Sequence, residues 1–398
     1  MKLFQKLLLA PAAIGFLSPI AANASEANLM DVSNYSQVDV EVTQDTFKPL
    51  TTKNPLLAGG EGLGNSVSSD FDGDSFSSTT SATFSSNFLL GAVDKTVDEK
   101  TQFIFDYGIE LATSFTGSDS LDVELEAGHG GGSVLTDADL TDTSSQLKVG
   151  SIGYTATLGD NEKLTLYLGA KAAPGSALYA SACRYEGITN NLDDCGVAIT
   201  NLDEELGTAI GASFNLGSGF SMAFGYQGEG LSTNGLMTDE GTDAFGGQVA
   251  YIQDNYGIAI AAASIENHDD TSITARDQGT TTSTAISAFY APDIDRLPSI
   301  SVGIENSHDD ALAATLDEKS HYFVGLQWDN VGEGTLGASF GSKEPYAENV
   351  DAQTMYELFY RYNYADGISI TPVIFVKENN ANQVDDETGM LLKTSFSF

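Results

Sequence analysis

Gln102-Phe-Ile-Phe-Asp-Tyr-Gly-Ile-Glu-Leu111 is a run in which apolar and polar side chains nearly alternate. Its odd-numbered positions are all apolar or aromatic, and its even-numbered positions are mostly polar or glycine. A period of two residues is that of a β-strand, whose successive side chains point to opposite faces. An apolar face toward hydrocarbon and a polar face toward water are typical of a strand in a membrane-spanning β-barrel.

The same alternation recurs along the chain, for example in residues 121–126 and 356–364. Strands are expected near residues 76–93, 101–115, 120–128, 144–159, 164–174, 207–216, 220–230, 243–253, 256–267, 280–291, 299–308, 320–329, 334–343, 354–364, 368–378 and 388–398. Glycine is abundant at 41 residues, proline is scarce at 9, and no window shows sustained helical periodicity. The chain is therefore expected to be all-β, a transmembrane antiparallel β-barrel of about 16 strands.

The expected connections alternate in length. Short turns such as 116–119 and 254–255 alternate with longer links such as 129–143 and 175–206, as in outer-membrane barrels. An even number of strands places both chain ends on the short-turn rim. The last strand is apolar on alternate positions and ends in Phe398, which resembles the signal that barrel-assembly machinery recognises, so we expect that machinery as a partner.

The N-terminus carries the marks of export. Lys2 and Lys6 precede an apolar run, and Ala22-Asn-Ala24 follows it, so residues 1–24 are interpreted as a signal peptide. Residues 25–75 are rich in Ser, Asp, Asn and Gly and are expected to form an irregular periplasmic segment. Residues 76–398 would form the barrel domain, and the expected location is an outer membrane of the Gram-negative type.

Charge and cysteine content narrow the possible partners. The chain has 56 acidic and 17 basic residues, a formal net charge of −39. Nucleic acid is excluded, because a binding face must neutralise phosphates with clustered Lys and Arg. The two cysteines, Cys183 and Cys195, lie in one polar segment, and a disulfide is the natural interpretation in an exported protein. A metal-binding pair is the weaker alternative.

Several segments resemble one family. Phe76-Ser-Ser-Thr-Thr-Ser-Ala-Thr-Phe84, Gly91-Ala-Val-Asp94, Phe105-Asp-Tyr107 and Thr113-Ser-Phe-Thr-Gly117 are similar to the first strands of cyanobacterial outer-membrane porins of the carbohydrate-selective-porin-like family. Asp31-Val-Ser-Asn-Tyr-Ser36 is similar to their mature N-terminus. The resemblance is specific over residues 1–36 and 76–128. It implies a barrel in outer-membrane lipid, often a homotrimer, that passes small hydrophilic solutes or inorganic ions.

The chain departs from that family in one respect. Such porins usually carry a surface-layer-homology domain after the N-terminal segment, which binds a cell-wall polymer. Residues 37–74 are too short for that domain and lack its helical, Trp-containing pattern. The chain is therefore expected to be a shortened relative without it.

The alternate strand positions that carry polar side chains identify candidate pore-lining residues. If the apolar parity faces lipid, the charged residues that point inward are Asp106, Glu110, Asp122, Glu124, Glu126, Lys148, Lys171, Arg361, Lys377 and Lys393. One hypothesis is that acidic and basic sectors face each other across part of the lumen and orient solutes in a transverse field. The alternative is a wet wall with scattered charges.

The third outer loop, 175–206, is the candidate constriction. It holds both cysteines together with Arg184, Asp193 and Asp194. In the porins that the chain resembles, this loop folds inward and narrows the channel. A disulfide would restrict such a loop by removing unfolded freedom worth roughly 3 kcal/mol. The alternative is a flexible, exposed loop that the bridge only staples to itself.

No catalytic residues are predicted. The four histidines form no metalloprotease or nucleophile-elbow pattern, so neither an enzyme nor a cofactor is expected. Two outer loops share acidic, His-containing starts at 266–270 and 305–310, which could attract a metal, but chance similarity is the simpler explanation and no metal site is predicted. The expected function is passive diffusion through a porin. A non-conducting barrel with an adhesive or structural role is the alternative.

Overall fold

A computed structural model describes most of the barrel region of the chain. The residues described are 79–94, 100–130, 135–138, 140–159, 163–171, 174–189, 195, 197, 200, 202, 207–230, 235–238, 241–267, 279–294, 296–310, 318–343, 353–378 and 386–398. The expected signal peptide, the expected N-terminal segment, and Asp193 and Asp194 lie outside these residues.

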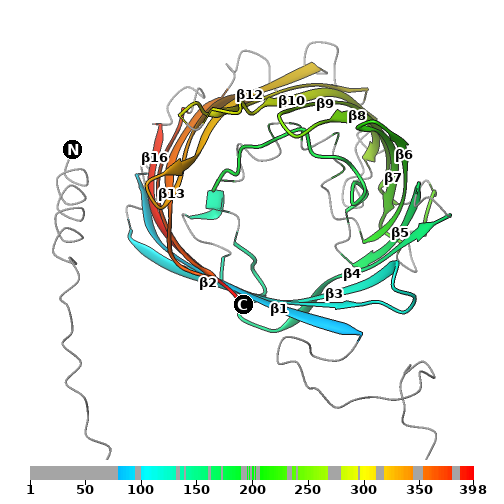
Figure 1. Cartoon of the computed structure of the whole chain (residues 1–398), viewed down its shortest axis with the longest axis horizontal. Helices are drawn as coiled ribbons and strands as arrows, with labels where there is room; N and C mark the ends of the chain where they lie inside the picture. The colour runs from blue at the N-terminus through cyan, green and yellow to red at the C-terminus, as the bar shows by residue number, and fades with distance from the viewer. Residues whose placement is uncertain are drawn as a thin grey trace, which may run out of the picture. The chain divides into compact units, whose positions relative to one another are not determined.

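Sixteen antiparallel strands form one closed barrel (Figure 1). Their bounds are β1 (Thr80–Asp94), β2 (Gln102–Thr113), β3 (Asp119–Gly128), β4 (Lys148–Leu158), β5 (Leu164–Lys171), β6 (Thr208–Gly217), β7 (Phe220–Gly228), β8 (Asp243–Ile252), β9 (Tyr256–Asn267), β10 (Gly279–Tyr290), β11 (Ser299–Asp309), β12 (Glu318–Val331), β13 (Gly334–Lys343), β14 (Gln353–Ala365), β15 (Ile368–Lys377) and β16 (Glu387–Ser397). Each expected strand overlaps one of these, and the predicted all-β, 16-strand barrel is confirmed. The only helix described is a short 3-10 turn, η2 (Thr136–Ala138), and no helix of the described residues is long and apolar enough to cross a membrane.

The first and last strands close the ring. β1 pairs with β16 from Ser85↔Ser397 to Asp94↔Thr388. At the end of this seam the Phe398 ring stacks on the Phe84 ring, with centroids 5.4 Å apart, and the two backbones exchange hydrogen bonds of 2.8 and 3.0 Å. Closure leaves no unpaired strand edge, so every strand finds partners on both sides.

The outward face of the barrel is apolar. Phe103, Leu168 and Ile260 are each more than half exposed, at 58%, 57% and 55%. Aromatic rings on neighbouring strands lie against one another there, as Phe340 and Tyr356 do at 6.5 Å. An exposed apolar surface that encircles a barrel is unfavourable in water and favourable in hydrocarbon.

The hydrophobic core lies inside the barrel. The described residues of two connections enter the lumen: those of the second loop, between β3 and β4, and those of the third loop, between β5 and β6 (Figure 1). Their apolar side chains pack on inward-facing wall residues in one cluster, which consists of Leu89, Val93, Ile104, Leu135, Ala138, Leu140, Tyr185, Ile188, Cys195, Phe323, Met355, Phe359, Val373, Phe375 and Leu391. The inward face therefore includes apolar side chains where a loop covers it.

Candidate functional site

The third loop lies along the inner wall and forms hydrogen bonds with side chains of several strands. Its backbone N–H groups donate to inward side chains of four strands: Gly175 to Gln227 of β7 (3.1 Å), Ala180 to Gln248 of β8 (2.8 Å), Arg184 to Ser301 of β11 (2.8 Å) and Glu186 to Gln327 of β12 (3.0 Å). A loop buried in a barrel has no neighbouring strand to satisfy its backbone, and an unpaired buried N–H is costly. The polar side chains of the wall supply the missing acceptors.

Glu357 of β14 holds the end of the outgoing limb of the third loop, which is residues 174–189. Its carboxylate, 3% exposed, accepts the N–H of Thr189 at 2.7 Å, the N–H of Ile188 at 3.1 Å and the hydroxyl of Tyr185 at 2.8 Å. Burial, and secondarily the charge of Glu357, raise the pKa of Tyr185, so the phenol stays protonated and donates. One buried carboxylate thus holds three residues of the loop.

The ring of Tyr185 fits an aromatic socket in the wall. It packs between Phe323 of β12 at 5.4 Å and Phe359 of β14 at 5.7 Å. A Cβ at Gly325 would lie 2.7 Å from the ring, so glycine leaves room for it. The sequence analysis assigned no role to these inward residues. The available signal was one large aromatic residue among the mostly polar inward positions of each strand, Phe323 in β12 and Phe359 in β14.

The returning limb is also attached to the wall. The predicted disulfide between Cys183 and Cys195 is present, with Cα atoms 6.0 Å apart, and it joins the two limbs. Thr200 donates its N–H and its hydroxyl to the buried Glu305 of β11, at 2.8 and 3.0 Å. Nδ1 of His321 lies 3.6 Å from the same carboxylate. The loop therefore crosses the wall out to β14 and comes back.

The second loop also enters the lumen, which the sequence analysis did not predict. Its Leu135 is 1% exposed and belongs to the internal hydrophobic cluster. A Cβ at Gly128 would meet the carbonyl oxygen of Thr141 at 1.9 Å, so the two ends of this loop pack too closely for any side chain there. The glycines at 128 and 130 were the available signal, because glycine permits such backbone contact.

Two of the basic residues predicted to point inward form ion pairs with the loops. Arg361 forms an ion pair with Glu186 of the third loop, and Lys377 pairs with Asp137 of the second loop at 3.3 Å. Arg184 places its guanidinium over the Phe289 ring, 4.7 Å from the centroid, and donates to the carbonyl oxygen of Asp254 at 3.2 Å.

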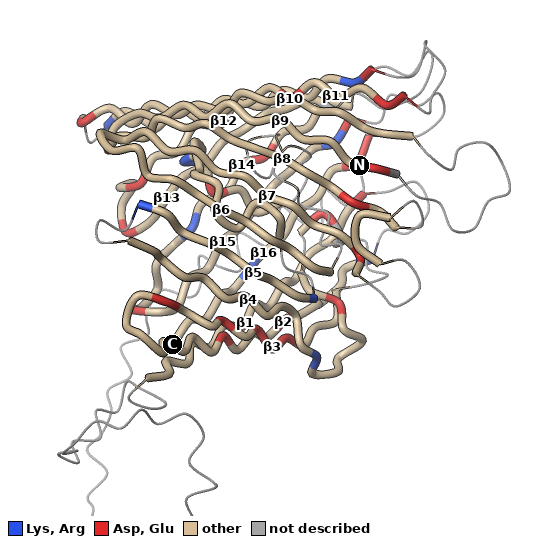
Figure 2. Tube along the Cα trace, turned by 90° about the vertical axis from the view of Figure 1, so that its right-hand side faces the viewer, with Lys and Arg blue, Asp and Glu red and all other residues tan. Residues whose placement is uncertain are grey.

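The predicted acidic residues gather on β2 and β3 (Figure 2). Strand register puts Asp106, Glu110, Asp122, Glu124 and Glu126 on the face of the sheet that also carries Glu357. Glu110 and Glu124 are directly opposite each other, and such like-charge pairs repel. Asn87 donates to Asp106 at 2.8 Å, and Ser151 donates to Glu124 at 3.1 Å. These five carboxylates form the acidic wall.

The remaining predicted bases share that face of the sheet. Lys148 pairs across from Glu126, Lys171 across from Ser151, and Lys393 across from Leu89.

The hypothesis of opposed charge sectors is wrong. In the closed ring β14, β15 and β16 run into β1, β2 and β3, so Arg361, Lys377 and Lys393 lie beside the acidic wall. Lys148 and Lys171 flank it on β4 and β5. The physical reason is closure, because pairing of β16 with β1 makes the end of the chain a neighbour of its beginning. In a ring of sixteen strands β10 is the strand opposite β2, and there the third loop covers the wall.

Comparison with known proteins identifies the fold. Sequence comparison matches this chain to no protein family and to no curated protein. Solved structures with a similar fold include OprB of Pseudomonas putida, with a TM-score of 0.57 and 10% identity over 80% of this chain and 94% of that chain. An anion-selective porin of Comamonas acidovorans has a TM-score of 0.57 and 14% identity over 80% of this chain and 100% of that chain. OmpT of Vibrio cholerae, with one loop deleted, has a TM-score of 0.56 and 12% identity over the same shares. The barrel thus has the fold of outer-membrane porins.

Proposed function

We propose that this chain is an outer-membrane pore for passive diffusion of small hydrophilic solutes or inorganic ions, without a cofactor or an energy source. One observation carries the proposal: the closed barrel is apolar outside, while its inner face is charged where no loop covers it. Hydrocarbon outside and water inside are the conditions under which such a sorting is stable. The porin folds of the solved structures named above support it.

We propose further that the free path lies between the third loop and the acidic wall. All wall contacts made by hydrogen bonds from described residues of the loop go to β7–β14 or to the β8–β9 turn. The acidic wall, Lys148, Lys171 and Lys393 would then line the pore, and Arg184 would lie at the constriction. Because Arg361 and Lys377 are paired with loop carboxylates, the remaining inner charge is acidic and favours cations.

The charge selectivity of the pore tests this assignment. A Glu110→Gln/Glu124→Gln variant should lower the K⁺/Cl⁻ permeability ratio by a factor on the order of 2–5, because each carboxylate attracts a passing cation by up to about 1 kcal/mol in water. Reversal potentials across a planar bilayer under a KCl gradient would measure it. Glu333→Gln, in the β12–β13 turn, is the matched control and should leave the ratio unchanged. An unaltered ratio in the double variant would remove the acidic wall from the path.

The second candidate function is a non-conducting barrel with an adhesive or structural role. The internal hydrophobic cluster favours it, since the two loops fill part of the lumen. Reconstitution separates the two functions directly. Channels with steady conductance support the pore, and vesicles that stay tight to K⁺ at high protein content support the plugged barrel.

The cellular setting follows from the sequence. We propose that residues 1–24 are removed on export, that residues 25–75 remain periplasmic, and that barrel-assembly machinery recognises the strand ending in Phe398. The resemblance of residues 1–36 and 76–128 to cyanobacterial porins supports a homotrimer in outer-membrane lipid, as a shortened relative without a surface-layer-homology domain. Cross-linking of the protein in native membranes would test the trimer.

A further inference from the structure

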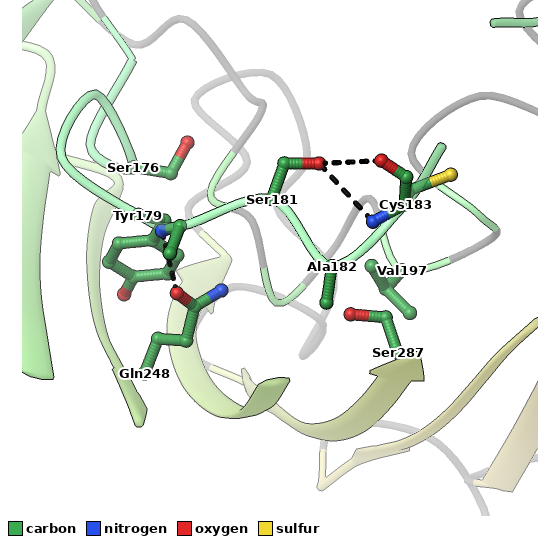
Figure 3. A pocket seen from close by; sticks show the side chains of 9 residues that line it. Ser176, Tyr179, Ser181, Ala182, Cys183, Val197, Gln248 and Ser287 are labelled. Atoms are coloured by element: carbon green, nitrogen blue, oxygen red, sulfur yellow. Dashed lines mark hydrogen bonds between the residues drawn. The ribbon is translucent and has the colours of Figure 1, made fainter. Parts of the chain in front are cut away.

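A small chamber lies between the third loop and the barrel wall (Figure 3). The loop contributes residues 176 and 179–183 from its outgoing limb and Val197 from its returning limb. The wall contributes Gln248 of β8 and Ser287 of β10. The cavity has a volume of about 180 Å³. That is room for about six water molecules at ~30 Å³ each, the size of a three- or four-carbon polyol.

Among the residues that the structure describes, those lining the chamber are all uncharged. Its polar side chains are those of Ser176, Tyr179, Ser181, Gln248 and Ser287. Arg184 follows the lining residue Cys183 in the chain. Its guanidinium lies over the Phe289 ring and donates to the carbonyl oxygen of Asp254. The chain has a formal charge of −39, but the described lining of this chamber carries none. A charged solute would lose hydration there without gaining a partner of opposite charge.

Several of these polar groups have hydrogen-bonding capacity to spare. The Gln248 oxygen accepts the N–H of Ala180 at 2.8 Å, so its amide nitrogen remains as a donor. The hydroxyls of Ser176 and Ser287 make no hydrogen bond to any described residue. The hydroxyl of Ser181 is already occupied, accepting from the N–H of Cys183 and donating to its carbonyl oxygen, both at 3.3 Å. The chamber thus offers a donor amide and two hydroxyls that can both donate and accept.

The walls of the chamber are held in place before any solute arrives. The Cys183–Cys195 disulfide borders it, and Ala182 packs on Ala250, Ala259 and Phe289. A preformed site avoids the entropy cost of ordering a loop on binding.

We propose that this chamber binds one small uncharged polyol, of about the size of erythritol, beside the path of diffusion. The inference rests on the proposed pore function, because the solute would reach the chamber from the lumen. The site would retain neutral hydroxylated solutes near the constriction, while the acidic wall acts on ions.

Ligand-observed NMR on the detergent-solubilised full chain tests the proposal. Erythritol should show saturable binding, and tartrate, a four-carbon dicarboxylate with two hydroxyls, should show none. Ser287→Ala should weaken erythritol binding about three- to tenfold, the loss of one hydrogen bond. Ser287→Leu, which fills the chamber, should abolish it. Ser213→Leu, on the inward face of β6, is the matched control and should bind like the unaltered protein.

The outcomes separate the chamber from the pore. Conducting channels whose protein shows no saturable erythritol binding would overturn the chamber and leave the pore standing. Equal binding of tartrate would overturn its neutral chemistry, and undiminished binding by Ser287→Leu would overturn its location. If the unaltered protein forms no conducting channel, the proposed pore function is wrong, whatever the NMR result.

Discussion

At the scale of single residues, buried wall side chains decide where the loops lie. Glu357 and Glu305 each collect donors from the third loop, one at its far end and one on its return. A carboxylate is suited to this because its two oxygens accept several hydrogen bonds, and bonds to a charged acceptor are stronger than neutral ones. The width of the lumen therefore depends on a few inward residues that a solute need not touch.

Glu357→Gln should loosen the tip of the third loop. The amide nitrogen of Gln would face the N–H groups of Ile188 and Thr189, and an unsatisfied buried donor costs about 1–3 kcal/mol. We expect single-channel currents with much larger fluctuations, in a barrel that still folds. Glu110→Gln is the control, since it removes a carboxylate from the acidic wall without touching the loop. Quiet currents of unchanged size in Glu357→Gln would show that this carboxylate does not position the constriction.

At the scale of elements, three kinds of contact hold the third loop in its position. The disulfide closes a ring with a sequence separation of 12, Tyr185 packs between two aromatic rings of the wall, and backbone N–H groups donate to side chains of β7, β8, β11 and β12. Because each kind of contact acts at a different place, loss of one leaves the others to hold the loop. This differs from a flexible loop that a bridge only staples to itself.

The Cys183→Ser/Cys195→Ser variant should therefore separate stability from pore width. Loss of the bridge should lower the free energy of unfolding by about 2–4 kcal/mol, chiefly through the unfolded chain. Mean conductance should stay near that of the oxidised protein, because Glu357 and Glu305 still hold both limbs. Denaturant titration and bilayer recording on the same preparation measure the two quantities. A large rise in conductance would mean that the disulfide, and not the wall, holds the loop inward.

At the scale of the whole molecule, closure of the ring determines which charges are neighbours. Pairing of β1 with β16 brings Lys393 next to Leu89 and places the basic strands beside the acidic ones. The seam also carries the C-terminal aromatic residue, which is 75% exposed and stacks on Phe84. Its position indicates a part in closing the barrel.

Phe398→Ala should slow closure of the barrel. An aromatic pair contributes about 0.5–1.5 kcal/mol beyond its area, so folding into lipid vesicles should slow by a few-fold while the conductance of folded channels stays the same. Phe224→Ala removes another exposed aromatic residue, in β7 and far from the seam, and serves as the control. The rate of the shift in electrophoretic mobility on folding measures the effect. Equal rates for both variants would assign Phe398 no special role.

The alternation of side chains was enough to predict the strands and their number, because a two-residue period is local. The disulfide was predicted separately, because the chain has only two cysteines and carries the marks of export. The alternation was not enough to predict that Leu135 and Tyr185 lie in the lumen, or that Phe323 and Phe359 pack on Tyr185. The odd or even position of a residue in a strand tells which side of the strand its side chain occupies. What covers that side depends on loops that are distant in sequence. The neighbours of Arg361 and Lys377 likewise came from ring closure and from ion pairs with the loops, which are contacts between segments that no local pattern contains.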